Sequence, residues 1–487
     1  MGILGSHKKL PCSGRGIGAS DCSHRCLPPE SSSRIADGVE PPGRKDHNHT
    51  DQNATNVPAT IEPGSNGDLV MKTTLRRRLA GWLAGHDAVP TTGQAVLGYY
   101  ADSGVFDRES IRLKRIVDRR TEAMIDDAFQ PVEAAIADDF DVDPANVSFS
   151  YDTKLTMPAE LTLGQIYRTA RQRADDGADP VALSVWTDAS AETADLAEND
   201  VAGPVTFRHS ITEAQWQTGP SSPQDLVDGG DYLTRLVLAA LIDGDMRDAI
   251  NDAEFGDFSV AFDVTPDERR RVAEIAQATL ESELEESFER LPDEVREIYE
   301  WAVDLSERHQ DRDPHFRDLF EAARDGDQAA REQIRTEYRD ASLSAFDTEV
   351  DLFEGVETLP YLKTQYARVG VIYDGMIEMY RRAGLPVDEA FKRSIVLAII
   401  GAQIWLDDVD DYADDRVEGQ LTPVTAEYVL AEDAETAYDR IVSISEEYFE
   451  LAETFATQTD SPLTGIATEY IYRSGDPSVL PGAVADE

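Results

Sequence analysis

The stretch Gly401–Asp415 reads G-A-Q-I-W-L-D-D-V-D-D-Y-A-D-D and follows directly on the most apolar part of the chain, Ile395–Leu406. If the segment is one α-helix, four of its aspartates fall within an arc of about 100° on one face. These four are Asp407, Asp408, Asp411 and Asp415. Neighbouring carboxylates raise one another's pKa unless a cation lies between them. The pattern therefore predicts a site for a hard, oxygen-seeking cation such as Mg²⁺.

The alternative interpretation is a solvated acidic surface, because the whole chain is acidic. It has 95 Asp and Glu against 45 Lys and Arg, a net charge of −50. Clusters such as 138–143 and 175–176 are interpreted as surface. The segment at Asp407 differs from them because an apolar run leads into it and Gln403 lies one turn upstream.

Composition limits the class of protein. With 487 residues and 41% hydrophobic content, the chain is long enough and apolar enough for a large folded core. The acidity and the scarcity of Lys, 8 against 37 Arg, are typical of a cytoplasmic protein of a salt-accumulating halophile. The same charge disfavours nucleic acid and anionic membrane surfaces as partners. No run of 18 apolar residues occurs, so no integral membrane segment is predicted.

The first 70 residues differ from the rest. They hold all three cysteines and are almost neutral, with seven Lys and Arg against eight Asp and Glu. Cys22 and Cys26 with His24 lack a fourth zinc ligand at the usual spacing. We interpret residues 1–70 as a disordered extension or a mis-assigned start, with translation beginning at Met71.

The remaining chain divides into three predicted parts. Residues 71–220 form a region of unassigned role with a helix over 108–139 and strand-like alternation at 147–151, 181–186 and 205–207. Residues 221–473 are predicted to be helical, and 474–487 to be a frayed tail. The helices are expected at 229–252, 266–289, 293–309, 313–342, 358–383, 387–415, 424–431 and 433–457. A break is expected at Gly384-Leu-Pro386.

A second motif accompanies the aspartates. Lys363-Thr364 lies 44 residues before Asp407, and the later segment reads A-Q-I-W-L-D-D-V-D-D. This pair resembles the second half of the class I isoprenoid synthases, which include trans-polyprenyl diphosphate synthases and terpene synthases. In that family a Lys-Thr pair precedes a helix reading F-Q-x-x-D-D-x-x-D. Gln403 takes the glutamine place once one extra residue is allowed.

The resemblance implies roles for these residues. Asp407, Asp408 and Asp411 would be the catalytic, Mg²⁺-binding aspartates, and Asp415 would extend the metal site. Lys363, Thr364 and Gln403 would contact the substrate diphosphate.

The family also has an earlier aspartate motif, and its best match here follows the apolar run 236–242. The metal ligands would be Asp245, Asp248 and Asp252, although Gly244 stands in the first aspartate place. An acidic helix end at the surface is the alternative.

Two departures from the family narrow the expected activity. The basic segment that binds isopentenyl diphosphate in chain-elongating members has no match, and Arg269–Arg271 is too distant to be the arginine pair that follows the first motif. We therefore expect a mostly α, isoprenoid synthase-like helical bundle of the halophilic archaeal type that ionises one bound prenyl diphosphate with Mg²⁺. The alternative is a non-catalytic helical relative that binds divalent ions or protein partners. The oligomeric state stays open, a homodimer included.

Overall fold

The computed structural model describes residues 77–78, 80–81, 83–84, 91–104, 108–151, 156–175, 211–252, 255, 258–343, 351–459 and 461–483. The described chain is mostly helical, as the sequence predicts. The predictions for residues 1–70 and for strands at 181–186 and 205–207 lie outside the described residues. Within the described part, no helix combines the length and the apolar character needed to cross a membrane.

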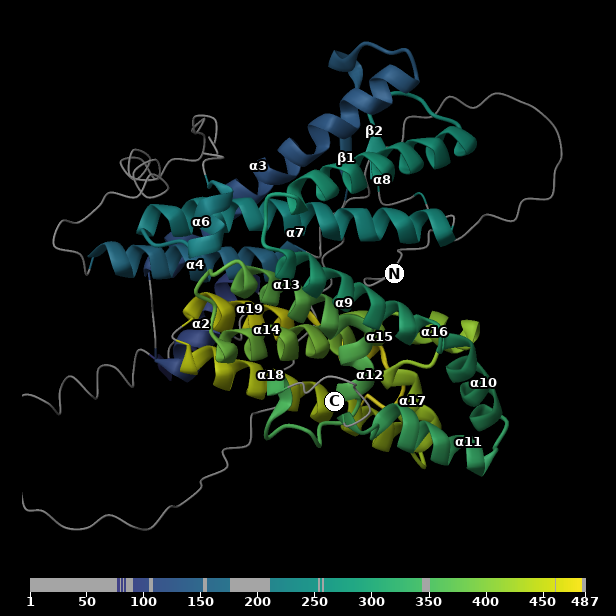
Figure 1. Cartoon of the computed structure of the whole chain (residues 1–487). Helices are drawn as coiled ribbons and strands as arrows, with labels where there is room; N and C mark the ends of the chain where they lie inside the picture. The colour runs from purple at the N-terminus through teal and green to yellow at the C-terminus, as the bar shows by residue number, and fades with distance from the viewer. Residues whose placement is uncertain are drawn as a thin grey trace, which may run out of the picture.

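The helices form two layers, one above the other in Figure 1. The upper layer contains α3 (Arg108–Asp139), α4 (Met157–Asp175), α6 (Glu213–Thr218), α7 (Pro223–Asp252) and α8 (Pro266–Phe288). The lower layer contains the helices from α9 onward, together with α2 (Thr91–Ser103), which lies beside α19 (Pro462–Ser474).

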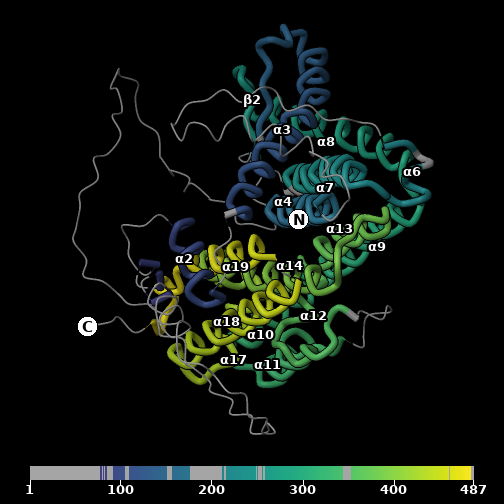
Figure 2. Tube along the Cα trace, turned by 90° about the vertical axis from the view of Figure 1, so that its left-hand side faces the viewer, coloured from purple at the N-terminus to yellow at the C-terminus, as the bar shows by residue number. Residues whose placement is uncertain are grey.

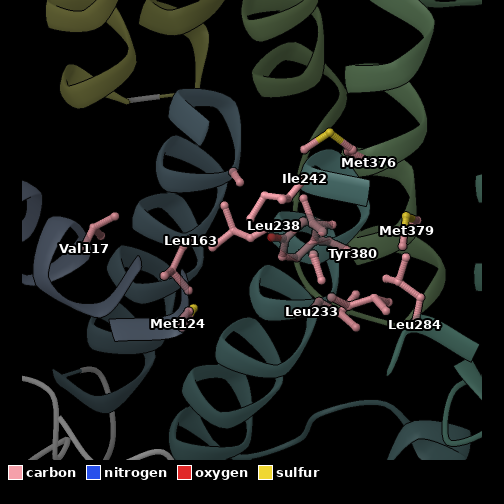
Figure 3. Close-up of a cluster of buried hydrophobic side chains, with 14 of the residues drawn as sticks. Val117, Met124, Leu163, Leu233, Leu238, Ile242, Leu284, Met376, Met379 and Tyr380 are labelled. Carbon is pink, nitrogen blue, oxygen red and sulfur yellow. The ribbon is translucent and has the colours of Figure 1, made fainter. Parts of the chain in front are cut away.

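One hydrophobic cluster joins the upper layer to the lower one through α13 (Val371–Arg382). Figure 3 shows Leu163 of α4 and Leu238 of α7 converging on Tyr380 of α13. The Tyr380 hydroxyl lies 2.8 Å from the Thr234 hydroxyl of α7, which satisfies both groups in the buried centre. Helices α3 and α4, from the predicted region 71–220, therefore share one core with α7 and α8.

A short antiparallel ladder ties the first part of the chain to the middle. Strand β1 (Phe149–Tyr151) pairs with β2 (Phe258–Val260), with Ser150 opposite Ser259. The strand-like alternation at 147–151 thus forms a strand, although its partner comes from the connection between α7 and α8.

The remaining lower-layer helices pack around a second cluster. They are α9 (Asp293–Gln310), α10 (Asp313–Arg324), α11 (Gln328–Gln333), α12 (Leu362–Gln365), α14 (Glu389–Ala402), α15 (Asp408–Asp410), α16 (Tyr412–Glu418), α17 (Pro423–Leu430) and α18 (Ala434–Gln458). Asp388 caps α14 by accepting a 2.7 Å hydrogen bond from the Phe391 N–H. Ser394 of α14 donates to the Ala452 carbonyl of α18 at 2.7 Å, which fixes these two helices against each other.

The structure tests the predicted helix break at Gly384 and the predicted frayed tail. Gly384 has φ +84° between α13 and α14, where the sequence predicts the break. Leu480, in the segment expected to be frayed, is buried in the second cluster. The described end of the chain is therefore packed as far as residue 483.

Helices α9 and α13 approach unusually closely. A Cβ atom on Gly375 of α13 would lie 2.5 Å from the Cβ of Ala302 of α9, so only glycine fits there. This contact sets the C-terminal end of α9 beside the segment that precedes α13, and that segment carries Lys363 and Arg368.

Candidate functional site

The aspartate segment is not the continuous helix expected over 387–415. Helix α14 ends at Ala402, the turn Gln403–Asp407 is π-helical, and α15 covers only Asp408–Asp410. Asp411 then leaves the helical conformation, with φ −87° and ψ 2°, and α16 begins at Tyr412. The uniform 100° spacing used for the sequence prediction therefore does not hold between Gln403 and Asp415.

The π-helical turn coincides with the extra residue between Gln403 and the aspartates. A π-turn closes over five residues instead of four, so it absorbs one additional residue within a helix. The buried side-chain amide of Gln403 donates to the Asp407 carboxylate, and it also hydrogen-bonds Asp408. Gln403 thus contacts both members of the aspartate pair that it precedes.

Four of the six aspartates gather, and two point to solvent. Asp408 is only 1% exposed, and Asp407, Asp411 and Asp415 are half-buried, whereas Asp410 and Asp414 are exposed. Burial, together with the charges of Asp407 and Asp415, raises the pKa of Asp408 well above its usual range. Burial and the charges of Asp411 and Asp407 raise the pKa of Asp415 to about 7.

A half-buried arginine faces these carboxylates. Arg368, on a second π-helical turn (Tyr366–Gly370), places its Nη1 3.5 Å from Asp408 Oδ1. Burial alone would lower the pKa of Arg368, but the charges of Asp408, Asp407 and Asp415 raise it above its usual range. The Arg368 side chain is 31% exposed, so the pair is open to solvent on the arginine side.

Buried His309, at the end of α9, lies near two further cations, Arg312 and Lys363. Burial and the positive charges of Arg368, Arg312 and Lys363 lower its pKa to about 3. Lys363 is half-buried, and its own pKa is lowered by burial and by the charge of Arg312. The neutral imidazole of His309 therefore lies among three cations, and one of them, Arg368, also contacts the gathered aspartates.

Strained backbone holds the lysine in place. Tyr361 is fully buried and has φ 63°, a left-handed conformation that costs a non-glycine residue free energy. Its hydroxyl donates to Glu427 at 2.8 Å, and its N–H donates to the Arg339 carbonyl at 2.6 Å. Helix α12, with Lys363 and Thr364, begins at the next residue. The Thr364 hydroxyl donates to the Tyr338 carbonyl at 2.9 Å, so in this structure it anchors α12.

The first aspartate candidate lies elsewhere. Asp245 lines a cavity of about 160 Å³ between α7, α9 and α13, with Glu307, Gln310 and Tyr373 among the other lining residues. None of the aspartates from 407 to 415 lines this cavity. The apolar residues Val409 and Tyr412 beside them belong to the second hydrophobic cluster, whereas the apolar residues of α7 belong to the first. The side chains of Asp248 and Asp252 lie outside the described residues. The described structure thus does not bring Asp245 to the same cavity as Asp408.

The chemistry of the gathered carboxylates fits Mg²⁺. Asp408 Oδ2 is buried and accepts no hydrogen bond, so one hard ligand atom is unused. Among the described residues, no three His, Cys, Asp or Glu side chains are grouped to hold a metal ion. Mg²⁺ is usually bound through one or two carboxylates together with substrate phosphates, and that mode needs no three-ligand cage.

The two aromatic residues that flank the aspartates, Trp405 and Tyr412, pack against other helices in the core. Trp405 stacks on Tyr472 of α19 and donates to the Tyr472 carbonyl at 2.8 Å. Tyr412 packs against Tyr428 of α17, with ring centroids 4.4 Å apart. Both rings therefore fix the segment to its neighbours.

Sequence reasoning missed four residues of this site: His309, Arg312, Tyr338 and Arg368. A signal was present, because the run Glu307–Asp313 reads E-R-H-Q-D-R-D at the predicted end of a helix. Arg368 lies five residues after Lys363, close to the distance of one π-turn.

Comparison of the chain with known protein families, curated proteins and solved structures found no match. The function is therefore inferred from the site alone.

Proposed function

We propose that the protein is a class I isoprenoid synthase that ionises the allylic C–O bond of a bound prenyl diphosphate with the aid of Mg²⁺. The observation that carries the proposal is the position of Arg368 against Asp408. Lys363 and Arg312 lie near His309, which Arg368 also approaches. A substrate diphosphate coordinated to divalent cations requires both kinds of group within one site, carboxylates for the metal and cations for the phosphate oxygens.

Side chains of this protein would bind both the substrate diphosphate and the metal. Lys363, Arg312 and Arg368 would bind the diphosphate oxygens, and Asp408 with its neighbours would hold Mg²⁺. Bound Mg²⁺ would neutralise the negative charge that develops on the leaving diphosphate. The C–O electron pair leaves with the diphosphate oxygen, and an allylic cation remains. The low polarity around Asp408 strengthens each of these electrostatic contacts.

The test is diphosphate release from C10, C15 and C20 allylic diphosphates in molar KCl with Mg²⁺. Asp408→Ala should lower the rate by about 10²–10³-fold, because a ligand of the charge-stabilising metal is lost. Asp414→Ala is the matched control, since Asp414 lies in the same segment but is exposed. If wild type turns over none of the three substrates, the proposal is wrong.

A non-catalytic relative that binds divalent ions or protein partners is the second candidate. It is favoured by the lining of the cavity beside Asp245, which includes none of the aspartates from 407 to 415, because class I synthases use two aspartate motifs across one cavity. Binding of Mg²⁺ with inorganic diphosphate, without turnover of any prenyl diphosphate, would support this second function.

A further inference from the structure

A second cavity lies among α2, α3, α4 and α19, and none of the aspartates from 407 to 415 lines it. Its volume is about 340 Å³, within the range of roughly 300–1,000 Å³ that is typical of small-molecule sites. Figure 2 shows α2 alongside α19 at this end of the molecule. The walls are mainly apolar and include Ala95, Val96, Ile111, Val117, Met157, Leu161, Leu463, Ile466 and Ala467.

The polar lining residues of this cavity are Thr92, Ser110, Tyr470 and three charged side chains that lie close together. Lys114 and Asp118 of α3 form an ion pair, with Lys114 Nζ 2.8 and 2.9 Å from the two carboxylate oxygens. Glu160 of α4 also lines the cavity and accepts a 2.9 Å hydrogen bond from the Thr156 hydroxyl. The charges of both Lys114 and Asp118 influence the pKa of Glu160, which burial raises, so the three groups share one end of the cavity.

These groups restrict the head group of a ligand. Two carboxyl groups against one ammonium disfavour an anion such as a phosphate or carboxylate. An ammonium head group could donate to the carboxylates but would face the charge of Lys114. A hydroxyl group can donate to a carboxylate and accept from the ammonium at the same time, so it uses both kinds of partner.

We propose that this cavity is a binding site for an uncharged aliphatic alcohol, with the chain along the apolar walls and the hydroxyl at Lys114, Asp118 and Glu160. The site is separate from the aspartate segment, and the inference does not depend on the proposed catalytic function. Tyr470, 36% exposed and also lining the cavity, lies where its apolar wall meets solvent.

The experiment compares three C10 compounds with the same chain and different head groups: geraniol, geranylamine and geranic acid. Calorimetry on the full chain in molar KCl should show that geraniol binds at least tenfold more tightly than geranic acid, with geranylamine between them. Geraniol that does not bind, or geranic acid that binds as tightly, would overturn the proposal.

Variants locate the binding. Ala467→Trp should fill the cavity and weaken geraniol binding at least tenfold, while Ala240→Phe, which fills the other cavity between α7, α9 and α13, should leave it unchanged. Val96→Phe repeats the test if the tryptophan variant does not fold, as judged by its thermal melting. Glu160→Gln should reduce the preference for geraniol over geranic acid, because it removes one of the two carboxyl groups. Unchanged binding in a folded cavity-filling variant would place geraniol elsewhere and refute the assignment.

Discussion

Arg368 Nη1 lies 3.5 Å from Asp408 Oδ1, and the second oxygen of that carboxylate, Oδ2, accepts no hydrogen bond. The arginine thus compensates only part of a buried negative charge, on one side of the carboxylate. The other side has an unused ligand atom next to Asp407 and Asp415, whose charges add to the local negative potential. This unequal arrangement motivates the first two predictions.

Asp408→Asn should weaken the binding of Mg²⁺ in the presence of inorganic diphosphate by at least tenfold. The amide keeps the shape of the side chain but loses the charge and one of the two oxygens that ligate a hard cation. Calorimetry at high salt measures the effect, and Asp414→Asn, a change in an exposed residue of the same segment, is the control. Equal affinity in wild type and Asp408→Asn would exclude Asp408 as a ligand.

Arg368→Met should lower the free energy of unfolding by about 3 kcal/mol without Mg²⁺, because the buried Asp408 carboxyl loses its opposite charge and must either take up a proton or stay uncompensated. Mg²⁺ with diphosphate should raise the melting temperature of this variant more than that of wild type, since the cation replaces the missing charge. Thermal melting with and without both additives gives the comparison. A double variant, Arg368→Met with Asp408→Asn, should recover part of the loss. If Mg²⁺ with diphosphate raised the melting temperature of wild type and of Arg368→Met equally, the cation would not be replacing the charge of Arg368.

His309 should make the protein sensitive to acid. Burial has the largest effect on its pKa, and the positive charges of Arg368, Arg312 and Lys363 add to it, so the pKa falls to about 3. In an unfolded chain the histidine pKa is near 6.5. Between these values the unfolded state binds one proton more, so this contribution to stability is complete above about pH 6.5 and is lost progressively as the pH falls. The slope reaches about 1.4 kcal/mol per pH unit.

Urea unfolding at pH 7, 5.5 and 4.5 measures this effect. His309→Gln should lose less stability than wild type between pH 7 and 4.5. His315→Gln serves as the control, because His315 is exposed beside the same helix end. Parallel pH dependences for wild type and His309→Gln would mean that His309 does not titrate as proposed.

Glu427 should be important for stability because it is buried and accepts hydrogen bonds from two other side chains. Its side chain is 1% exposed and binds Arg339 Nε at 2.7 Å and the Tyr361 hydroxyl at 2.8 Å. Glu427→Ala should cost about 3–5 kcal/mol, because a half-buried guanidinium and a buried hydroxyl lose their acceptor. Denaturant unfolding gives the value, and exposed Glu447→Ala should stay within about 0.5 kcal/mol of wild type. A loss below about 1 kcal/mol would show that solvent replaces the acceptor.

Much of the fold follows from local signals in the sequence. Helix α3 has the predicted bounds, and the break at Gly384 needs only a residue that tolerates positive φ. These features depend on residues close together in the chain, for which periodicity and turn chemistry are informative. The pairing of β1 with β2 joins residues more than 100 positions apart, and alternation alone indicates a strand without naming its partner.

The site was predictable in part. Apolar periodicity followed by aspartates identifies the segment that carries Asp408, and the motif spacing identifies Lys363. The neighbourhood of His309 was not predictable, because it depends on how α9 packs against α13, which is set by the contact of Gly375 with Ala302. The interruption of the helix at Asp411 was missed because a helical wheel assumes one uniform period.

The π-helical turn at Gln403–Asp407 has a consequence for how this segment tolerates insertions and deletions. A helix that must gain or lose a residue normally rotates everything beyond the change by about 100°, which would turn Asp408 out of its buried position. A π-turn stores one surplus residue locally, so deleting Ile404 should convert the turn to regular α-helix and leave Asp408 facing Arg368. The segment with Ile404 and the segment without it would then both place Asp408 against Arg368. A sequence motif with a fixed interval between the glutamine and the aspartate would match only one of the two.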